Sequence, residues 1–165
     1  MIIVEASTSY SELYHDYITE CVEGGVEHYN EAIGNPEEYL NTVVAYSQGQ
    51  QLPEGWVPIS TYFCIDDNRL LGAIRLRHGS NDYIDNVIGH VGYETRPSAR
   101  GLGVAQTLLT WLKENMLNDE VTLICSESNM ASQKVIEKCG GVFITSFHDN
   151  IGKKVALRYL LSNHR

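Results

Sequence analysis

The chain has 165 residues and carries 12 lysines and arginines against 21 aspartates and glutamates, a formal net charge of −9. This length predicts a single domain over residues 1–165 with a sizeable buried core. With 43% hydrophobic and 20% charged residues, the chain is neither disordered nor fibrous. The acidic balance argues against a general nucleic-acid or anionic-membrane binder and suits cationic partners.

The four cysteines are spread along the chain without a C-x-x-C pair, at Cys21, Cys64, Cys125 and Cys139. We therefore expect buried free thiols in a reducing compartment and no metal site. The first residues lack a basic segment ahead of a long apolar stretch, and no apolar run approaches the roughly 20 residues of a membrane span. These features predict a cytoplasmic protein without a membrane or nucleic-acid partner.

Apolar and turn-forming residues predict eleven main elements in chain order. Residues 2–4 form a short strand, and 9–28 have helical spacing that Gly24 and Gly25 weaken near its end. Asn35 caps a second helix, with Pro36 in its first turn. The remaining elements are strands at 60–65, 70–77 and 87–95, a helix at 104–116, a strand at 121–125, a helix at 129–139, and strands at 142–147 and 155–161. The order β-α-α-β-β-β-α-β-α-β-β predicts an α/β (α+β) domain with a mixed, mostly antiparallel sheet flanked by helices.

The clearest chemical signal lies between the predicted strand at 87–95 and the predicted helix at 104–116. The strand ends near Thr95, and Arg100, Gly101 and Gly103 lead straight into the helix at 104–116. Glycines let the backbone approach a ligand closely, and the first amides of a helix have no internal acceptors. Such a helix start binds phosphate, and Arg96 and Arg100 add positive charge.

Two other interpretations of these glycines are weaker. Gly101 and Gly103 would also suit a plain strand-to-helix turn, but the two arginines and the strong helix favour a phosphate site. A dinucleotide fingerprint needs a third glycine where Gln106 stands.

The segment Arg100-x-x-Gly103-x-Ala105 resembles the acyl-CoA pyrophosphate signature of the GNAT N-acetyltransferase superfamily. Asn129-x-x-Ser132 is similar to the start of the helix that follows in that family, and the element order is similar over essentially the whole chain. Segments 89–98 and 135–141 are similar to an uncharacterised bacterial branch known as predicted acetyltransferases.

The resemblance implies a GNAT-like domain that binds acetyl-CoA. The backbone of Tyr93, Glu94 and Thr95 would pair with the pantetheine arm as though the arm were an extra strand. This pairing would occur where two strands of the fold splay apart. Asn129 and Ser132 would hold the arm near the thioester. The pyrophosphate would lie on amides of Arg100, Gly101, Leu102, Gly103, Val104 and Ala105. An amine would attack the thioester directly in a ternary complex, without a covalent enzyme intermediate.

The residue that protonates the leaving thiolate is open. The family often has a tyrosine four residues after the position of Ser132, but Ile136 stands there. Ser128, another tyrosine such as Tyr159, or water would take its place. A thiol with a pKa of about 8.5 is also a tolerable leaving group unaided.

The base that deprotonates the amine is open as well. His90 has a suitable ordinary pKa, and Glu94 is a weaker candidate. Strand alternation places both on the face opposite Tyr93, however, and a lone histidine on a strand is more often structural.

Features that bear on the acceptor allow two interpretations each. Asp16, Glu20, Glu23 and Glu27 share one helix face, which is either solvated or a wall that attracts cations. The basic cluster of Arg75, Arg77 and His78 would bind an acceptor carboxylate or pair with that acidic helix. The aromatic residues Trp56 and Tyr62 would line the cleft or belong to the core.

We therefore expect an acyl-CoA-dependent N-acyltransferase that moves acetyl to a primary amine of a small molecule. A non-catalytic CoA-binding sensor and a protein or peptide N-acetyltransferase are the alternatives. The expected partners are acetyl-CoA and an amine acceptor, and a homodimer is compatible with the sequence. The acidic excess favours a cationic amine as acceptor.

Overall fold

Side-chain caps begin two helices at the positions that the sequence predicts. The Oδ1 atom of Asn35 accepts a hydrogen bond from the amide of Glu38 at 3.2 Å, and helix α2 (Pro36–Ser47) follows. The Oδ1 atom of Asn129 accepts from the amide of Ser132 at 3.1 Å at the start of α4 (Met130–Lys138). Both caps satisfy amides that have no partner within their own helix.

The computed structural model describes residues 1–149 and 154–163. Its strands and main helices follow the predicted order. The other two helices are α1 (Ser11–Glu23) and α3 (Val104–Met116), and the strands are β1 (Ile2–Glu5), β2 (Ile59–Asp66), β3 (Arg69–Arg77), β4 (Val91–Thr95), β5 (Val121–Ser126), β6 (Val142–His148) and β7 (Val155–Leu161). In the described part of the chain, no helix is long and apolar enough to cross a membrane.

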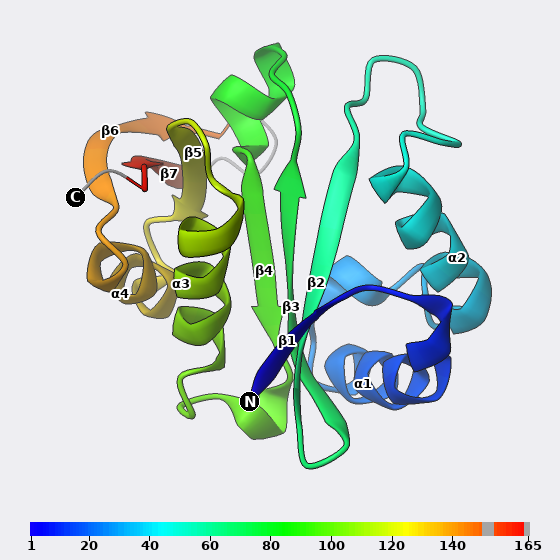
Figure 1. Ribbon diagram of the computed structural model, residues 1–165. Coiled ribbons are helices and arrows are strands. Elements are labelled where there is room, and N and C mark those ends of the chain that lie inside the picture. Colours follow the sequence, from blue (N-terminus) through cyan, green and yellow to red (C-terminus); the bar gives the residue numbers. More distant parts are fainter. Residues whose placement is uncertain (150–153, 164–165) are drawn as a thin grey trace.

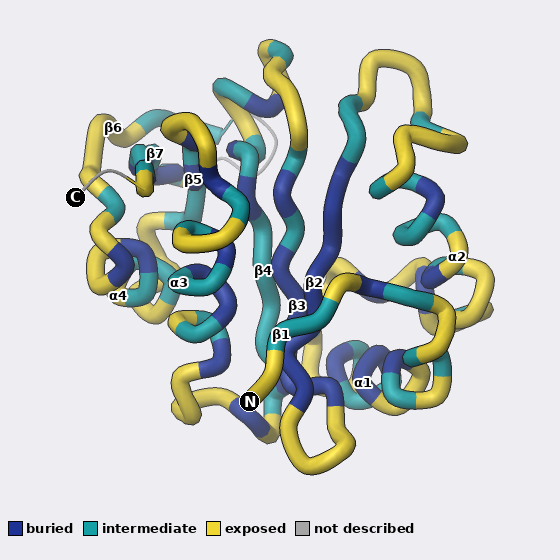
Figure 2. Tube along the Cα trace, viewed as in Figure 1, coloured by how far each residue is buried: buried dark blue, intermediate teal, exposed yellow. Residues whose placement is uncertain are grey.

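The strands form two antiparallel sheets, ordered β1-β2-β3-β4 and β5-β7-β6. Helices α1 and α2 cover one face of the first sheet, α3 covers the other face, and α4 lies beside α3 (Figure 1). The buried residues form one apolar cluster on each side of the first sheet, and in Figure 2 its strands β2 and β3 are buried along most of their length. The first sheet is therefore the shared wall of two cores.

One predicted strand is shorter than expected. Residues 84–88, part of which falls in the predicted strand 87–95, form a single π-helical turn, and β4 begins only at Val91. The amide of Ile84 donates to Asn81 Oδ1 at 2.8 Å, and the amide of Gly89 donates to the Ile84 carbonyl at 2.7 Å. These local hydrogen bonds satisfy the backbone without a neighbouring strand, so the apolar residues Val87 and Ile88 are not part of the ladder.

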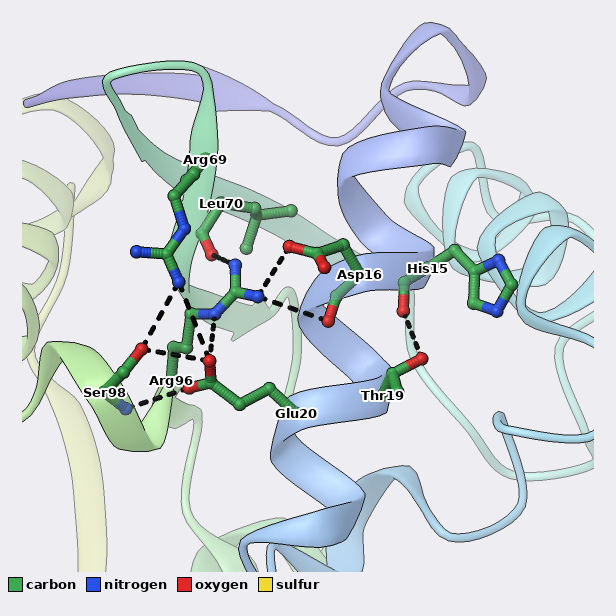
Figure 3. A network of polar contacts seen from close by, with 8 residues as sticks. All are labelled: His15, Asp16, Thr19, Glu20, Arg69, Leu70, Arg96 and Ser98. Carbon is green, nitrogen blue, oxygen red and sulfur yellow. Dashed lines mark hydrogen bonds and ion pairs between the residues drawn. The ribbon is translucent and has the colours of Figure 1, made fainter.

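Arg96 does not contribute to a phosphate site, because its guanidinium is buried against helix α1 (Figure 3). Its Nη2 atom lies 2.6 Å from Asp16 Oδ2, its Nε atom donates to Glu20 Oε1 at 3.0 Å, and its Nη1 atom donates to the Leu70 carbonyl at 3.1 Å. Arg96 thus pairs with two of the four acidic residues that were predicted to share one helix face. This face is therefore neither purely solvated nor a wall that attracts cations.

Glu20 also fastens the loop that leads into α3. Its carboxylate accepts from the Ser98 amide at 2.9 Å and from the Ser98 hydroxyl at 3.0 Å. Burial raises the pKa of Glu20, but the hydrogen bonds from Ser98 and Arg96 outweigh it and leave the pKa below its ordinary value. Glu20 is therefore a carboxylate at neutral pH and holds the Pro97–Ala99 turn against α1.

We predict that Arg96→Met lowers the free energy of unfolding by about 3 kcal/mol, because it removes the hydrogen bonds of a buried guanidinium and leaves the partly buried Glu20 carboxylate without its cation. Arg69→Met is the matched control, since Arg69 is half exposed and its Nη2 atom lies 3.6 Å from Glu20 Oε1. That exposed pair is worth less than about 1 kcal/mol. Urea unfolding followed by circular dichroism measures both, and equal losses would contradict this assignment of the Arg96 network.

Candidate functional site

Strands β4 and β5 meet at a single bridge, Gly89 to Leu123, within the described residues. There the His90 amide donates to the Thr122 carbonyl at 2.7 Å, and the Thr122 amide donates to the His90 Nδ1 atom at 3.0 Å. The Thr122 amide thus has a side-chain nitrogen, not a backbone carbonyl, as its acceptor. Gly89 allows the close approach: its φ is 74°, and a Cβ there would lie 2.8 Å from the Thr122 carbonyl oxygen.

The His90 side chain thus belongs to the junction between the sheets. Its Nε2 atom lies 2.8 Å from the Ser80 hydroxyl, so both ring nitrogens have partners. Burial lowers the pKa of His90; Asp85 opposes this shift and Arg77 adds to it. The ring lines a hollow bordered by residues 116–121 rather than the space between β4 and β5.

Beyond this junction the two strands diverge and leave a slot. The slot has a volume of about 370 Å³. Tyr93 of β4, Cys125 of β5, and Asn129, Ser132 and Ile136 around α4 line it. Arg75 and Arg77 of β3 also border it. The sequence places Tyr93, Asn129 and Ser132 together only through the family resemblance, and the structure brings all three to one cavity.

The edge of β4 that faces the slot is free to pair. The Arg77 amide donates to the His90 carbonyl at 2.8 Å, and the Arg96 amide donates to the Leu71 carbonyl at 2.8 Å. Alternate residues of an antiparallel strand bond to the same neighbour, so residues 92, 94 and 96 face β3, as does the carbonyl of His90. The backbone groups of Val91, Tyr93 and Thr95 consequently face away from β3, toward the diverging β5.

The loop before α3 presents a row of free amides. Gly101 and Gly103 have φ angles of 82° and 80°, a conformation that glycine adopts without strain, and Gly103 is the residue before the helix. Thr107 makes the first intrahelical bond, to the Gly103 carbonyl at 2.9 Å, so the amides of Val104 and Ala105 have no helical acceptor. Among the described residues, the exposed Arg100 side chain has no ion pair. Leu102 is exposed beside it.

The start of α4 borders the slot with two hydroxyls. The Tyr93 hydroxyl lies 2.7 Å from Ser132 Oγ. Burial raises the pKa of Tyr93 to about 12, although the hydrogen bond with Ser132 opposes the shift, so the hydroxyl keeps its proton at neutral pH. The sequence singles out Tyr93 for its backbone alone, and its hydroxyl was missed because strand alternation does not show which helix the side chain will reach.

Two other candidate acids lie outside the slot lining. The Ser128 hydroxyl lies 2.9 Å from Ser126 Oγ, in a shallow hollow bordered by Lys154 and Val155. The Tyr159 side chain is buried, and its hydroxyl donates to Glu137 Oε1 at 3.3 Å. Ile136, which stands at the position of the family tyrosine, is buried at the base of the slot.

The Glu94 side chain points to the opposite face of the sheet, toward α1. Both of its oxygens lie 2.6 Å from Arg75 guanidinium nitrogens, and the Tyr29 hydroxyl donates to Glu94 Oε1 at 2.6 Å. Burial raises the pKa of Glu94, but the charge and hydrogen bonds of Arg75 outweigh it, so the pKa lies below its ordinary value. Glu94 is thus a fully engaged carboxylate, and Arg75 pairs with it instead of the acidic helix.

A second cavity of about 240 Å³ lies on that face and shares Arg75 and Arg77 with the slot. Aromatic side chains of α1, α2 and the following loop line it, among them Tyr14, Tyr39, Tyr46 and Trp56. Of the two aromatic residues predicted to line the cleft or belong to the core, Trp56 lines a cavity. Tyr62 belongs to the core and packs against Trp111, with ring centroids 4.8 Å apart.

His28 also borders this second cavity, and nothing in the sequence pattern distinguishes it. Its ring is exposed toward the cavity and lies edge-on to Tyr29 at 4.8 Å between centroids. Partial burial and the positive charge of Arg75 lower its pKa to about 4. His28 is therefore neutral at neutral pH.

The sequence and the fold were compared with known proteins. A family model described as the acetyltransferase (GNAT) family matches residues 27–141. A search of curated proteins finds no significant match. Among solved structures, RimL, a ribosomal L7/L12 alpha-N-protein acetyltransferase in complex with coenzyme A, is similar with a TM-score of 0.72 at 14% identity, covering 98% of this chain and 93% of that one.

Two acetyltransferases with other acceptors have the same fold. The microcin C7 self immunity acetyltransferase MccE, in complex with acetyl-CoA and AMP, has a TM-score of 0.72 at 11% identity and covers 97% of this chain and 92% of its own. The spermidine N-acetyltransferase SpeG from Vibrio cholerae has a TM-score of 0.62 at 15% identity and covers 99% and 95%. At these identities the likeness shows the fold.

The family model covers more than half of the chain, and the fold agrees with that of these structures. The chain therefore belongs to the acetyltransferase (GNAT) family, and its acyl donor is acetyl-CoA.

Proposed function

We propose that this acetyltransferase moves the acetyl group of acetyl-CoA to a primary amine of a small molecule, by direct attack in a ternary complex. The observation that carries the proposal is the slot between β4 and β5, which meets a second, partly enclosed cavity at Arg75 and Arg77. One cavity suits the pantetheine arm, and the other suits an acceptor that approaches from the opposite face.

The donor would lie along three neighbouring features. The free backbone groups of Tyr93 and Thr95 would pair with the pantetheine arm as an added strand. The free amides of Gly101, Gly103, Val104 and Ala105 and the helix dipole of α3 would hold the pyrophosphate, with Arg100 as its unpaired cation. Asn129 and Ser132 would border the arm near the thioester.

The Tyr93 hydroxyl is the group that we assign to protonate the leaving thiolate. The neutral amine nitrogen bonds to the carbonyl carbon and releases one proton to water, the carbon–sulfur bond breaks, and the sulfur takes a proton from Tyr93. The Tyr93 oxygen then regains a proton from water. This hydroxyl lies at the slot wall beside Ser132 and keeps its proton at neutral pH. The Tyr93 hydroxyl would thus take the role of the family tyrosine, whose position is occupied by Ile136 in this chain. A replacement acid in the slot argues against a non-catalytic sensor.

The proposal is tested by release of free CoA thiol. The protein is incubated with acetyl-CoA and a panel of small amines, and with N-terminal peptides as the second arm, because RimL acts on a ribosomal protein. We expect thiol release and acetylated product with small amines. Turnover with peptides alone would show that the acceptor is a protein or peptide and not a small molecule. Acetyl-CoA binding without any turnover would overturn the proposal that the protein is catalytic.

Gly103→Val should abolish measurable acetyl-CoA binding by isothermal titration. The branched side chain strains a φ of 80° and projects into the space in front of the free α3 amides. Gly25→Val is the matched control, since Gly25 has a φ of 84° with open space around it but lies at the end of α1. Unchanged binding by the Gly103 variant would overturn the assignment of this loop to the pyrophosphate.

Tyr93→Phe should lower kcat by at least about 10-fold while leaving the KM for acetyl-CoA nearly unchanged. General acids contribute roughly 10²–10⁴-fold, and the lower end is expected because a thiolate leaves readily. Tyr159→Phe removes a hydroxyl of a buried tyrosine outside the slot and serves as control. Equal kcat values for the two variants would show that Tyr93 is not the acid.

A further inference from the structure

Arg75 and Arg77 extend from alternate positions of β3 toward the same face of the sheet. Of the two, only Arg75 pairs with a carboxylate among the described residues. Arg75 makes two bonds of 2.6 Å to the Glu94 carboxylate, which neutralise it. Arg77 donates to the Gly89 carbonyl at 3.2 Å, and no carboxylate of residues 1–149 or 154–163 forms an ion pair with it. Arg77 is partly buried, so its charge lacks both full hydration and a partner.

The surroundings of Arg77 are correspondingly positive. Burial and the adjacent charge of Arg75 lower the pKa of Arg77 to about 10, and the same charges help to lower the pKa of His28 across the cavity. A cationic group beside Arg77 would meet repulsion. Two of the four acidic residues that suggested a cationic acceptor, Asp16 and Glu20, are bound to Arg96.

Arg77 also lines four neighbouring hollows. They are the slot, the second cavity described above, the hollow beside the His90 ring and a further hollow of about 210 Å³. This last hollow has apolar walls, formed mainly by Trp56, Val57, Ile59, Tyr83, Ile84 and Ile88. At about 30 Å³ for each water molecule, it has room for about seven waters, or for one large side chain.

The apolar hollow is held together by polar contacts at its rim. The Asn81 side chain donates to the Gly55 carbonyl at 3.1 Å and accepts from the Ile84 amide at 2.8 Å, so it ties the loop before β2 to the π-helical turn. Trp56 and Tyr83 nevertheless remain 53% exposed. Exposed aromatic side chains around a preformed hollow are typical of a ligand site.

We propose that the acceptor is an α-amino acid with a large apolar side chain, whose carboxylate pairs with Arg77 and whose side chain fills the hollow between Trp56 and Tyr83. The α-amine is attached to the same carbon as the carboxylate, so a carboxylate on Arg77 holds the amine at the border of the slot. This inference rests on the proposed amine acetyltransferase activity and narrows its acceptor class.

The test compares matched acceptors in the thiol-release assay. L-phenylalanine and L-leucine are set against L-phenylalaninamide and phenethylamine, which lack the carboxylate, against glycine, which lacks the side chain, and against spermidine. We expect kcat/KM for phenylalanine to exceed that for phenylalaninamide by at least about 100-fold, because losing the anion leaves Arg77 unpaired. Equal rates with the amide or the amine would overturn this inference while leaving the proposed function intact. Thiol release with none of the amines would instead refute the proposed function.

Two variants assign the preference to residues. Arg77→Met should abolish the preference for phenylalanine over phenylalaninamide, and Arg77→Lys should restore part of it. Trp56→Ala should reduce kcat/KM for phenylalanine at least about 10-fold while changing that for glycine little. Thermal melts check that each variant is folded, and the acceptor comparison on the unmodified protein decides the proposal if one is not. A preference for the carboxylate that survives in Arg77→Met would contradict the role of Arg77.

Discussion

The hydrogen bond from the Thr122 amide to the His90 imidazole is the contact on which the candidate site depends. It joins the residue before β4 to β5 beside the one bridge between the two sheets in the described residues. Gly89 makes this close approach possible, since any Cβ would press on the backbone of β5. The slot and the free edge of β4 lie directly beyond this junction. A histidine that resembles a general base is therefore better explained as part of the junction.

Charged side chains near the site form two networks, one around Arg96 and one around Arg75. The carboxylates of α1 surround Arg96 and thereby hold the loop before α3 (Figure 3). Glu94 neutralises Arg75 under the hydroxyl of Tyr29. Arg100, in the loop before α3, and Arg77, at the border of the slot, have no ion pair among the described residues. The net charge of −9 thus says little about the ligands, because much of the acidic excess near the site is already paired.

Local patterns predicted the elements well where a short segment contains all of the information needed. The helix Val104–Met116 has its predicted bounds because its apolar residues recur at helical spacing, and Asn35 and Asn129 cap the helices that they precede. The prediction was wrong at residues 87–90, where apolar residues suggested a strand. Ile88 instead lines the slot, and an apolar residue beside a cavity has the same local signature as one in a ladder.

The sequence by itself determined the order of the elements, the helix caps and the glycine-rich loop before α3, because each depends on residues within a few positions of one another. It also carried the family resemblance that the family model confirms. Only the tertiary structure decided which charges cancel. Arg96 meets Asp16 across 80 positions, Arg75 meets Glu94 across 19, and Arg77 meets no carboxylate in the described residues. Such pairings depend on which faces of distant elements pack together, and spacing along the chain does not show this.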